Sequence, residues 1–293
     1  MVSIIWGLAA AFSLGVADFS AREAGRREGV LTTLLYVQLI GSPLTIGLAL
    51  ASKDVAWSSL GSAAVLLGVV SGIMLTIGNL LFYKALVEGP LLIVAPITSS
   101  FAVVTIALSL SSGEHPTWLQ MSGIIVTLFG IILAAAASSG VAHNIRPLNG
   151  ENFLTWKSSG VVLAIAAAIL FGISFWLMKF AVLRLGSQLT VVVLRHTALM
   201  VMIGIFLVTR RSPRPRSWAS LRWVAPVAFL DTIATWFINL GLQAGLASVV
   251  SVITSLYSVV TIVLGYYLLR EHITRTQQIG IGFTLAGLVL ASV

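Results

Sequence analysis

The sequence predicts an all-α integral membrane protein in which ten transmembrane helices form two inverted five-helix repeats around a central cavity. The chain of 293 residues is 58% hydrophobic and only 9% charged, and its mean hydropathy is +1.04. An average soluble domain carries roughly 25% charged residues, which it needs to cover its surface. In addition, apolar segments recur along the whole chain. The phrase ITSSFAVVTI (97–106) recurs in similar form as ITSLYSVVTI (253–262).

The apolar segments were delimited by charges, glycine, proline and polar clusters. A spanning helix needs roughly 20 apolar residues to cross about 30 Å of hydrocarbon. Segments of this kind predict spanning helices at 2–20, 30–50, 60–86, 90–111, 117–138, 158–180, 187–209, 222–243, 246–269 and 274–292. No positively charged segment precedes the first of them, so we expect an uncleaved spanning helix there and not a signal peptide.

The repeated phrase belongs to a longer duplication. The same landmarks follow both copies at an offset of 157 residues: Glu114, Gly123 and Gly130 in the first half, and Glu271, Gly280 and Gly287 in the second. An accidental match would not extend so far, and solenoid repeats recur every 20–50 residues. We therefore predict a first five-helix repeat at 1–138, a polar linker loop at 139–157 and a second repeat at 158–293. Because five is odd, the second copy enters the membrane upside down.

The formal net charge of +8 comes from basic residues that lie mainly between the apolar segments. This placement indicates membrane orientation and argues against a nucleic-acid-binding face. The even-numbered connections carry only Lys53, Lys179 and Arg184. The odd-numbered connections carry Arg22, Arg26, Arg27, Lys84, Arg146, Lys157, Arg210, Arg211, Arg214, Arg216, Arg222, Arg270 and Arg275. The positive-inside rule predicts that the odd-numbered connections face the cytoplasm and that both termini lie on the outer side. We expect the membrane to be the bacterial cytoplasmic (inner) membrane.

Two five-helix halves of this kind resemble the EamA-type branch of the drug/metabolite transporter superfamily. The resemblance is carried by FYKALVEGPLLIVAPITSSFAVV (82–104) and NLGLQAGLASVVSVITSLYSVV (239–260), each followed by the Glu and Gly landmarks. It implies a cofactor-independent carrier with ten helices that exports amino acids or other metabolites, and the general character of the chain suggests the branch that exports aromatic amino acids. The halves differ where Ser251 or Val252 replaces Pro96, so a proline break is not implied in both.

Ionisable residues inside a bilayer are costly and require a structural or functional reason. Arg195 and Asp231 lie eight or nine residues into consecutive, antiparallel predicted helices, and an ion pair between them is geometrically possible. The pair is either structural or an anchor for a substrate carboxylate, to which arginine offers two parallel donors. Asp18 stands one turn before Arg22 at the predicted end of the first helix, where a terminal i, i+4 pair is expected. The first helix would then hold no carboxylate at mid-depth.

Further candidates share a helix face or lie in the repeated phrases. Small and hydroxyl-bearing residues in membrane helices also serve helix packing, which is an equal alternative for the serines and threonines. The residues predicted to bind substrate or to line the cavity are Asn79, Tyr83, Thr98, Ser99, Ser100, Trp176, Arg195, Asp231, Thr235, Trp236, Asn239, Gln243, Ser255 and Tyr257.

Motifs for catalysis and cofactor binding are missing from the sequence. The chain has no cysteine, its four histidines lack metal-ligand spacing, and no GxSxG, HExxH, CxxC or Walker pattern occurs. We therefore predict no catalytic residue, no metal and no cofactor, and transport of a small molecule driven by gradients. A membrane-embedded lipid-modifying enzyme, a multidrug exporter of the same superfamily and a channel or scaffold are the alternatives.

Overall fold

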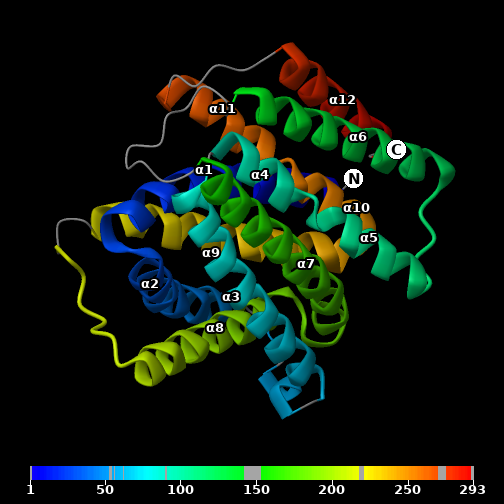
Figure 1. The fold of residues 1–293 in the computed structure, drawn as a ribbon. Helices are drawn as coiled ribbons and strands as arrows, with labels where there is room; N and C mark the ends of the chain where they lie inside the picture. Colours follow the sequence, from blue (N-terminus) through cyan, green and yellow to red (C-terminus); the bar gives the residue numbers. More distant parts are fainter. Residues whose placement is uncertain are drawn as a thin grey trace.

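A computed structural model describes residues 2–52, 55, 57–61, 63–89, 91–141, 153–217, 221–269 and 275–291. All regular structure within these residues is helical (Figure 1). The elements are α1 (Val2–Glu28), α2 (Val30–Ala51), the 3-10 helix η1 (Trp57–Gly61), α3 (Ala64–Glu88), α4 (Leu91–Ser99), α5 (Phe101–Ser111), α6 (Trp118–Val141), α7 (Phe153–Leu185), α8 (Ser187–Thr209), α9 (Leu221–Ala244), α10 (Ala247–Ser255), α11 (Tyr257–Leu269) and α12 (Arg275–Ala291).

The predicted fold class is confirmed. Eight helical segments among the described residues are long and apolar enough to cross a membrane, and two of them, Ile93–Ser111 and Ala247–Tyr267, each combine two helices. Helices α6 and α12 take the fifth place in each half, so the predicted order of ten spans is reproduced. Some predicted boundaries were wrong. Helix α1 continues to Glu28, and α6 and α7 both extend into the predicted linker loop, of which residues 142–152 lie outside the described residues.

A single glycine joins the first two helices of each half. Gly29 has a φ of 86° and Gly186 a φ of 78°, in the left-handed region that favours glycine because it has no Cβ. Each donates its backbone N–H to the carbonyl four residues earlier, Gly25 or Val182, at 2.9 Å. The two glycines are 157 residues apart, which is the offset of the predicted repeat. The same turn is therefore built twice.

The repeated phrase is the place where the fourth span of each half is divided. Helix α4 ends at Ser99 and α10 ends at Ser255. These serines occupy equivalent positions in the two phrases, which are offset by 156 residues. The Ser99 hydroxyl donates to the Pro96 carbonyl at 2.8 Å, and the Ser255 hydroxyl donates to the Val252 carbonyl at 2.6 Å. Hydroxyls that bond to carbonyls within the preceding turn compete with the helical pattern. The division occurs in both halves, and the second lacks a proline, so Pro96 is not required for it.

Helices α6 and α12 lie side by side and make the most extensive contact between two elements (Figure 1). A Cβ added to Gly130 would overlap the Thr284 backbone, and one added to Gly287 would overlap the Thr127 backbone. Both pairs are related by the offset of 157, so the contact is reciprocal, as a two-fold relation requires. This close approach explains Gly130 and Gly287, the second of the two landmark glycines in each half.

The two halves are interlocked through their first and third helices. Helix α1 packs along α9, and α7 packs along α3. The first helix of each half also contacts the divided span of the other half at a glycine. A Cβ on Gly15 would stand 2.9 Å from the Tyr257 carbonyl oxygen, and one on Gly172 would stand 2.8 Å from the Phe101 carbonyl oxygen. Each contact is thus made twice, once in each direction.

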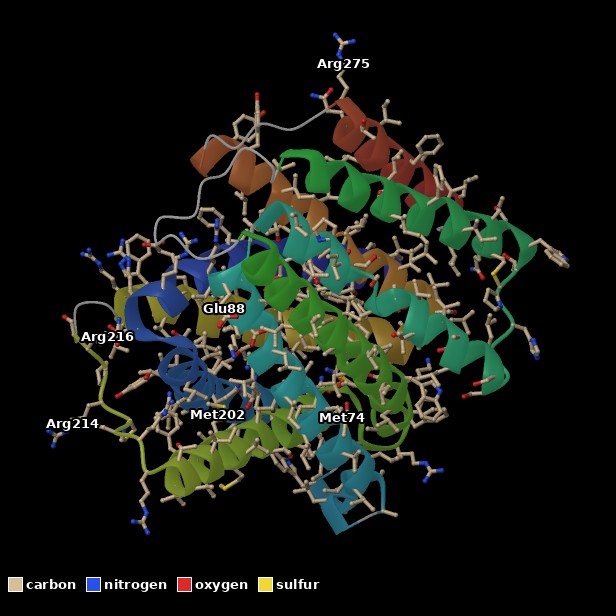
Figure 2. All side chains as sticks on the ribbon, viewed as in Figure 1. Met74, Glu88, Met202, Arg214, Arg216 and Arg275 are labelled. Atoms are coloured by element: carbon tan, nitrogen blue, oxygen red, sulfur yellow. The ribbon has the colours of Figure 1, made fainter. Side chains whose placement is uncertain are left out.

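Charged side chains gather at the periphery of the bundle. Arg214, on the connection between α8 and α9, and Arg275, at the start of α12, project away from the helices (Figure 2). The guanidinium of Arg27 lies 4.8 Å from the centre of the Trp223 ring, and tryptophan is enriched at membrane interfaces. Arg27, at the end of α1, therefore lies at interfacial depth.

Glu114, the acidic landmark of the first half, binds the start of a helix in the other half. Its carboxylate accepts the backbone N–H of Ala247 at 2.8 Å and that of Ser248 at 3.1 Å. These groups are the free donors at the N-terminus of α10, in the other half. Beside them, Lys179 donates to the carbonyls of Leu242 and Gly245 at the end of α9. The equivalent Glu271 lies outside the described residues.

The reciprocal glycine contact generates a stability prediction. In Gly130→Ala the new methyl group meets backbone atoms of α12, so we expect a loss of about 1–3 kcal/mol of stability. Gly282→Ala on α12 is the control, because nothing lies within 4 Å of its Cβ position, and its effect should be neutral or slightly stabilising. Thermal unfolding of the two variants in detergent measures the difference, and equal melting temperatures would contradict the reciprocal contact.

Candidate functional site

A cavity of about 60 Å³ lies between the two halves. Pockets that hold drug-sized ligands measure roughly 300–1,000 Å³, so this cavity has room for only a handful of water molecules. It is lined by Leu14, Asp18, Gln38, Leu75, Thr76, Asn79, Phe82, Phe101, Phe171, Phe175, Met178, Leu194, Arg195, Ala198, Asp231, Thr235, Ile238 and Tyr257. These residues come from α1, α2, α3 and α5 of the first half and from α7, α8, α9 and α11 of the second.

Most lining residues are related to one another by the repeat. Seven pairs occur, at an offset of 157 in the first two helices of each half and of 156 in the third and fourth spans. The pairs are Leu14–Phe171, Asp18–Phe175, Gln38–Arg195, Leu75–Asp231, Asn79–Thr235, Phe82–Ile238 and Phe101–Tyr257. The two-fold relation between the halves exchanges the two members of each pair. Because both members line the cavity, the cavity lies on the axis of this relation, the pseudo-two-fold axis. It is therefore the place where both halves contribute equally.

Arg195 organises the polar side of the cavity, and only 3% of it is exposed. Its Nη1 donates to Gln38 Oε1 at 3.0 Å, and its Nη2 donates to Asp231 Oδ2 at 2.6 Å and to Thr235 Oγ1 at 3.4 Å. The ion pair with Asp231 is thus present. Gln38 is the repeat counterpart of Arg195, so this hydrogen bond crosses the axis. The guanidinium holds α2, α8 and α9 together.

Asp18 is a cavity residue that its sequence context had placed at a helix end. Because α1 continues to Glu28, Asp18 lies well inside the helix, where 5% of it is exposed and it lines the cavity. The expectation of a first helix without a carboxylate at depth was wrong. Its carboxylate receives no hydrogen bond from the described residues, and it lies close enough to Asp231 for their charges to repel.

A signal for this placement was present in the sequence. Ala17, Ala21, Ala24 and Gly25 are small and buried, as in the first part of α1. Small residues of this kind let a membrane helix approach its neighbours closely. Their continuation past residue 20 indicates that the packed helix does not end there.

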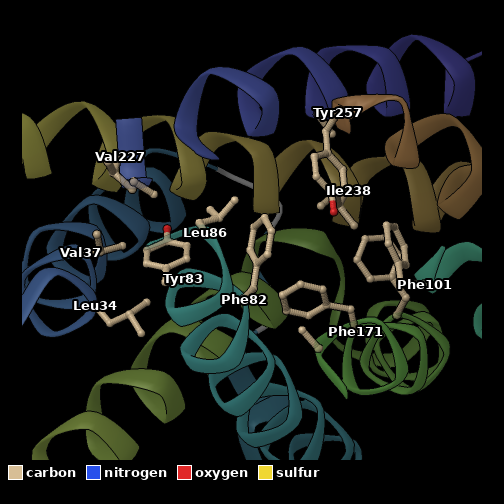
Figure 3. Close-up of a cluster of buried hydrophobic side chains, with 14 of the residues drawn as sticks. Leu34, Val37, Phe82, Tyr83, Leu86, Phe101, Phe171, Val227, Ile238 and Tyr257 are labelled. Carbon is tan, nitrogen blue, oxygen red and sulfur yellow. The ribbon is translucent and has the colours of Figure 1, made fainter. Parts of the chain in front are cut away.

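Aromatic rings form the rest of the cavity wall. Phe101 lies 4.7 Å from Phe175 and 6.4 Å from Tyr257, centroid to centroid, and Phe82 lies 6.0 Å from Phe171 and 6.4 Å from Tyr257. Figure 3 shows Phe82, Phe101, Phe171 and Tyr257 facing one another from different helices. The cavity therefore combines one polar wall with one extended aromatic wall.

The structure brings five of the fourteen predicted residues to this cavity: Asn79, Arg195, Asp231, Thr235 and Tyr257. Four others direct their hydroxyls to carbonyls of their own helix. Those four are Thr98, Ser99, Ser100 and Ser255. Their role in the described structure is local, in the division of the fourth spans.

The remaining five predicted residues lie around the cavity without lining it. Tyr83 is buried in the main apolar core, and the amide of Asn239 donates to the Thr235 carbonyl at 2.7 Å. Trp236 lines a separate narrow pocket between α2, α8 and α9. Trp176 Nε1 donates to Ser112 Oγ at 2.7 Å, and Gln243 is exposed near the end of α9.

Several lining residues were not among the candidates predicted from the sequence, which were mainly polar residues that share a helix face. Phe82, Phe101, Phe171 and Phe175 look like ordinary core residues in an apolar sequence. Gln38 was identifiable, because the offset of 157 maps it onto Arg195. The repeat offset therefore predicts which residue faces an ionisable side chain such as Arg195 across the axis.

The buried ion pair generates a second prediction. Arg195→Gln leaves the Asp231 carboxylate buried without its partner, and we expect it to cost about 3–5 kcal/mol. In the double variant Arg195→Gln/Asp231→Asn both charges are gone, so part of this loss should be recovered. Unfolding in detergent measures all members of the cycle. The exposed Arg184→Gln is the control and should stay within about 0.5 kcal/mol of the wild type; additive losses in the cycle would argue against the pair.

Comparisons with known proteins agree with this architecture. A protein of Methanocaldococcus jannaschii described as uncharacterized is 31% identical over 137 residues, which are 46% of this chain and 98% of that protein. The relative is thus about the size of one half. A crystal structure covers 99% of this chain and 96% of its own with a TM-score of 0.73, and at 15% identity it supports the fold alone.

The sequence profile described as EamA-like transporter family matches this chain twice, over residues 1–136 and 158–293. The two matches together cover most of the chain and include every residue that lines the cavity. The protein therefore belongs to the EamA-like transporter family, as a multi-pass integral membrane protein with two EamA units.

Proposed function

We propose that the protein is a secondary transporter that exports amino acids with aromatic or other bulky neutral side chains, or closely related metabolites, without ATP. The observation that carries the proposal is the composition of the cavity on the pseudo-two-fold axis. Arg195 offers a guanidinium for a carboxylate group, and the aromatic wall offers an apolar surface for a side chain. The bacterial aromatic amino acid exporter YddG is the individual carrier that the sequence suggests.

The size of the cavity supports alternating access. At about 60 Å³ it is too small for an amino acid, so the halves must move apart to admit one. A contact that this movement would break joins the halves near one end of the bundle. There Glu114 of the first half binds the start of α10 in the second, and beside it Lys179 holds α7 to the end of α9 within the second half. Rocking of one half against the other would exchange these contacts for their counterparts at the opposite end.

The other candidate functions differ in their support. Membership of a transporter family argues against a lipid-modifying enzyme. A multidrug exporter of the same superfamily is favoured by one observation, the Asp18 carboxylate in the cavity, which would suit a cation. The two transport hypotheses differ in whether the substrate must also carry a carboxylate, and flux assays with both kinds of substrate separate them.

Transport by purified protein in liposomes tests the proposal. We expect flux of labelled phenylalanine or tryptophan without ATP, and a loss of at least about tenfold in Arg195→Gln/Asp231→Asn, since a hydrogen bond to a charged group contributes about 1.5–3 kcal/mol. Arg184→Gln should transport like the wild type. The absence of flux for every amino acid would refute the proposed substrate class.

Topology provides a separate test. We propose that the protein lies in the bacterial cytoplasmic membrane with both termini outside. Arg216, between α8 and α9, donates to the Arg27 carbonyl, so the arginines of these two connections lie at one end of the bundle. Alkaline phosphatase fused after Val293 should then be active, whereas a fusion at Arg214 should be inactive. Green fluorescent protein at the same sites should give the reverse pattern. A fluorescent C-terminal fusion would show that the orientation is the reverse of the proposed one.

A further inference from the structure

We propose that Asp18 binds the ammonium group of the transported molecule, so that the cavity selects amines with an apolar, aromatic-sized body. The inference rests on the proposed function in one respect, because it takes the axial cavity as the substrate site. It goes further by assigning a second polar contact and by naming the chemical group that a substrate must carry.

The balance of charge in the cavity is the first argument. Three of its lining residues carry acidic or basic side chains: Asp18, Arg195 and Asp231. Arg195 and Asp231 form an ion pair at 2.6 Å and compensate each other. Asp18 is left over, so the ionised cavity carries a net charge of −1. Burying a carboxylate without a partner costs several kcal/mol, and a cation that enters the cavity recovers this cost.

The position of Asp18 is the second argument. Gly15, one turn earlier on α1, packs directly against the Tyr257 backbone, and Tyr257 lies within electrostatic range of Asp18. Asp18 is therefore held beside the aromatic wall and not at the rim of the bundle. Aromatic faces attract cations within about 6 Å, and Asp18 and Tyr257 line the same small cavity, so an ammonium group there can face both the carboxylate and the ring.

The asymmetry of the cavity is the third argument. The repeat counterpart of Asp18 is Phe175, whose ring centroid lies 4.7 Å from that of Phe101. One half thus supplies a carboxylate at the position where the other supplies an aromatic ring. A molecule with an ammonium group at one end and a ring at the other matches this difference.

A metal ion fits the site less well than an organic ammonium. Among the described residues, no group of three His, Cys, Asp or Glu side chains gathers anywhere. The Gln38 carbonyl oxygen and the Asp231 carboxylate in the same cavity already accept hydrogen bonds from Arg195, whereas a hard cation needs several oxygen ligands of its own. An ammonium group needs fewer partners and brings an apolar body that fills the rest of the space.

Equilibrium binding to the purified protein tests the inference with three probes of similar shape. Phenethylamine carries only the ammonium group, hydrocinnamate only the carboxylate, and phenylalanine both. We expect the wild type to bind phenethylamine and phenylalanine, and Asp18→Asn to weaken both by at least about tenfold while leaving hydrocinnamate unchanged. The control is Glu23→Gln on the same helix, whose carboxylate pairs with Arg27 outside the cavity.

Each other outcome overturns the inference. The proposed role of Asp18 is refuted if Asp18→Asn binds phenethylamine as tightly as the wild type, or if the wild type does not bind it. If the wild type binds a sodium ion from sodium chloride alone and Asp18→Asn does not, the site belongs to a metal ion. Asp18→Asn should also unfold at a higher temperature than the wild type without ligand, because it removes an uncompensated charge; a large destabilisation would mean that Asp18 has a structural partner.

The readout is independent of the proposed function. Amine binding is measured at equilibrium, so a protein that shows no amino acid flux in liposomes can still show Asp18-dependent binding of phenethylamine. Conversely, flux of amino acids with unchanged amine binding in Asp18→Asn would keep the proposed function and remove only the role of Asp18.

Discussion

A guanidinium buried in an apolar helix bundle must find its partners inside the protein, because lipid offers none. Arg195 meets this requirement with Gln38 on α2 and with Asp231 and Thr235 on α9. The planar fork of arginine allows several fixed bonds at once, which a lysine would not provide. The requirement therefore fixes three helices from both halves around one point, and the cavity is the space that these polar groups and the facing aromatic rings leave.

Close helix approach explains how so apolar a chain acquires a defined arrangement. Apolar side chains gain little from leaving lipid, so membrane helices associate through tight packing at small residues. Gly15 and Gly172 seat the first helix of each half on the divided span of the other, and Gly130 and Gly287 join α6 to α12. Since every such contact occurs twice, the assembly has a pseudo-two-fold axis. Any substrate site shared equally by both halves must lie on that axis.

The sequence predicted the architecture well and the cavity only in part, for physical reasons. Apolar length and the offset of 157 residues are global signals, and they lead to the spans and to the duplication. Arg195 and Asp231 were identifiable because ionisable residues at membrane depth are rare. Asp18 was misplaced because the charges that follow it, Arg22 and Glu23, resemble a helix end. The phenylalanines of the cavity wall carry no local signal that separates them from core residues, since only packing decides which rings face the axis.

The two halves agree where they pack and differ where they line the cavity. Gly15 matches Gly172, Gly29 matches Gly186, and Ser99 matches Ser255, and each match serves a helix contact or turn. None of the seven pairs that line the cavity has the same residue in both halves. A symmetric pocket would present the same groups to both ends of a ligand, which suits a symmetric ligand. A cavity with Asp18 facing one way and Phe175 in the equivalent place suits a molecule whose two ends differ, and the mismatches between the halves are therefore the positions at which substrate choice is made.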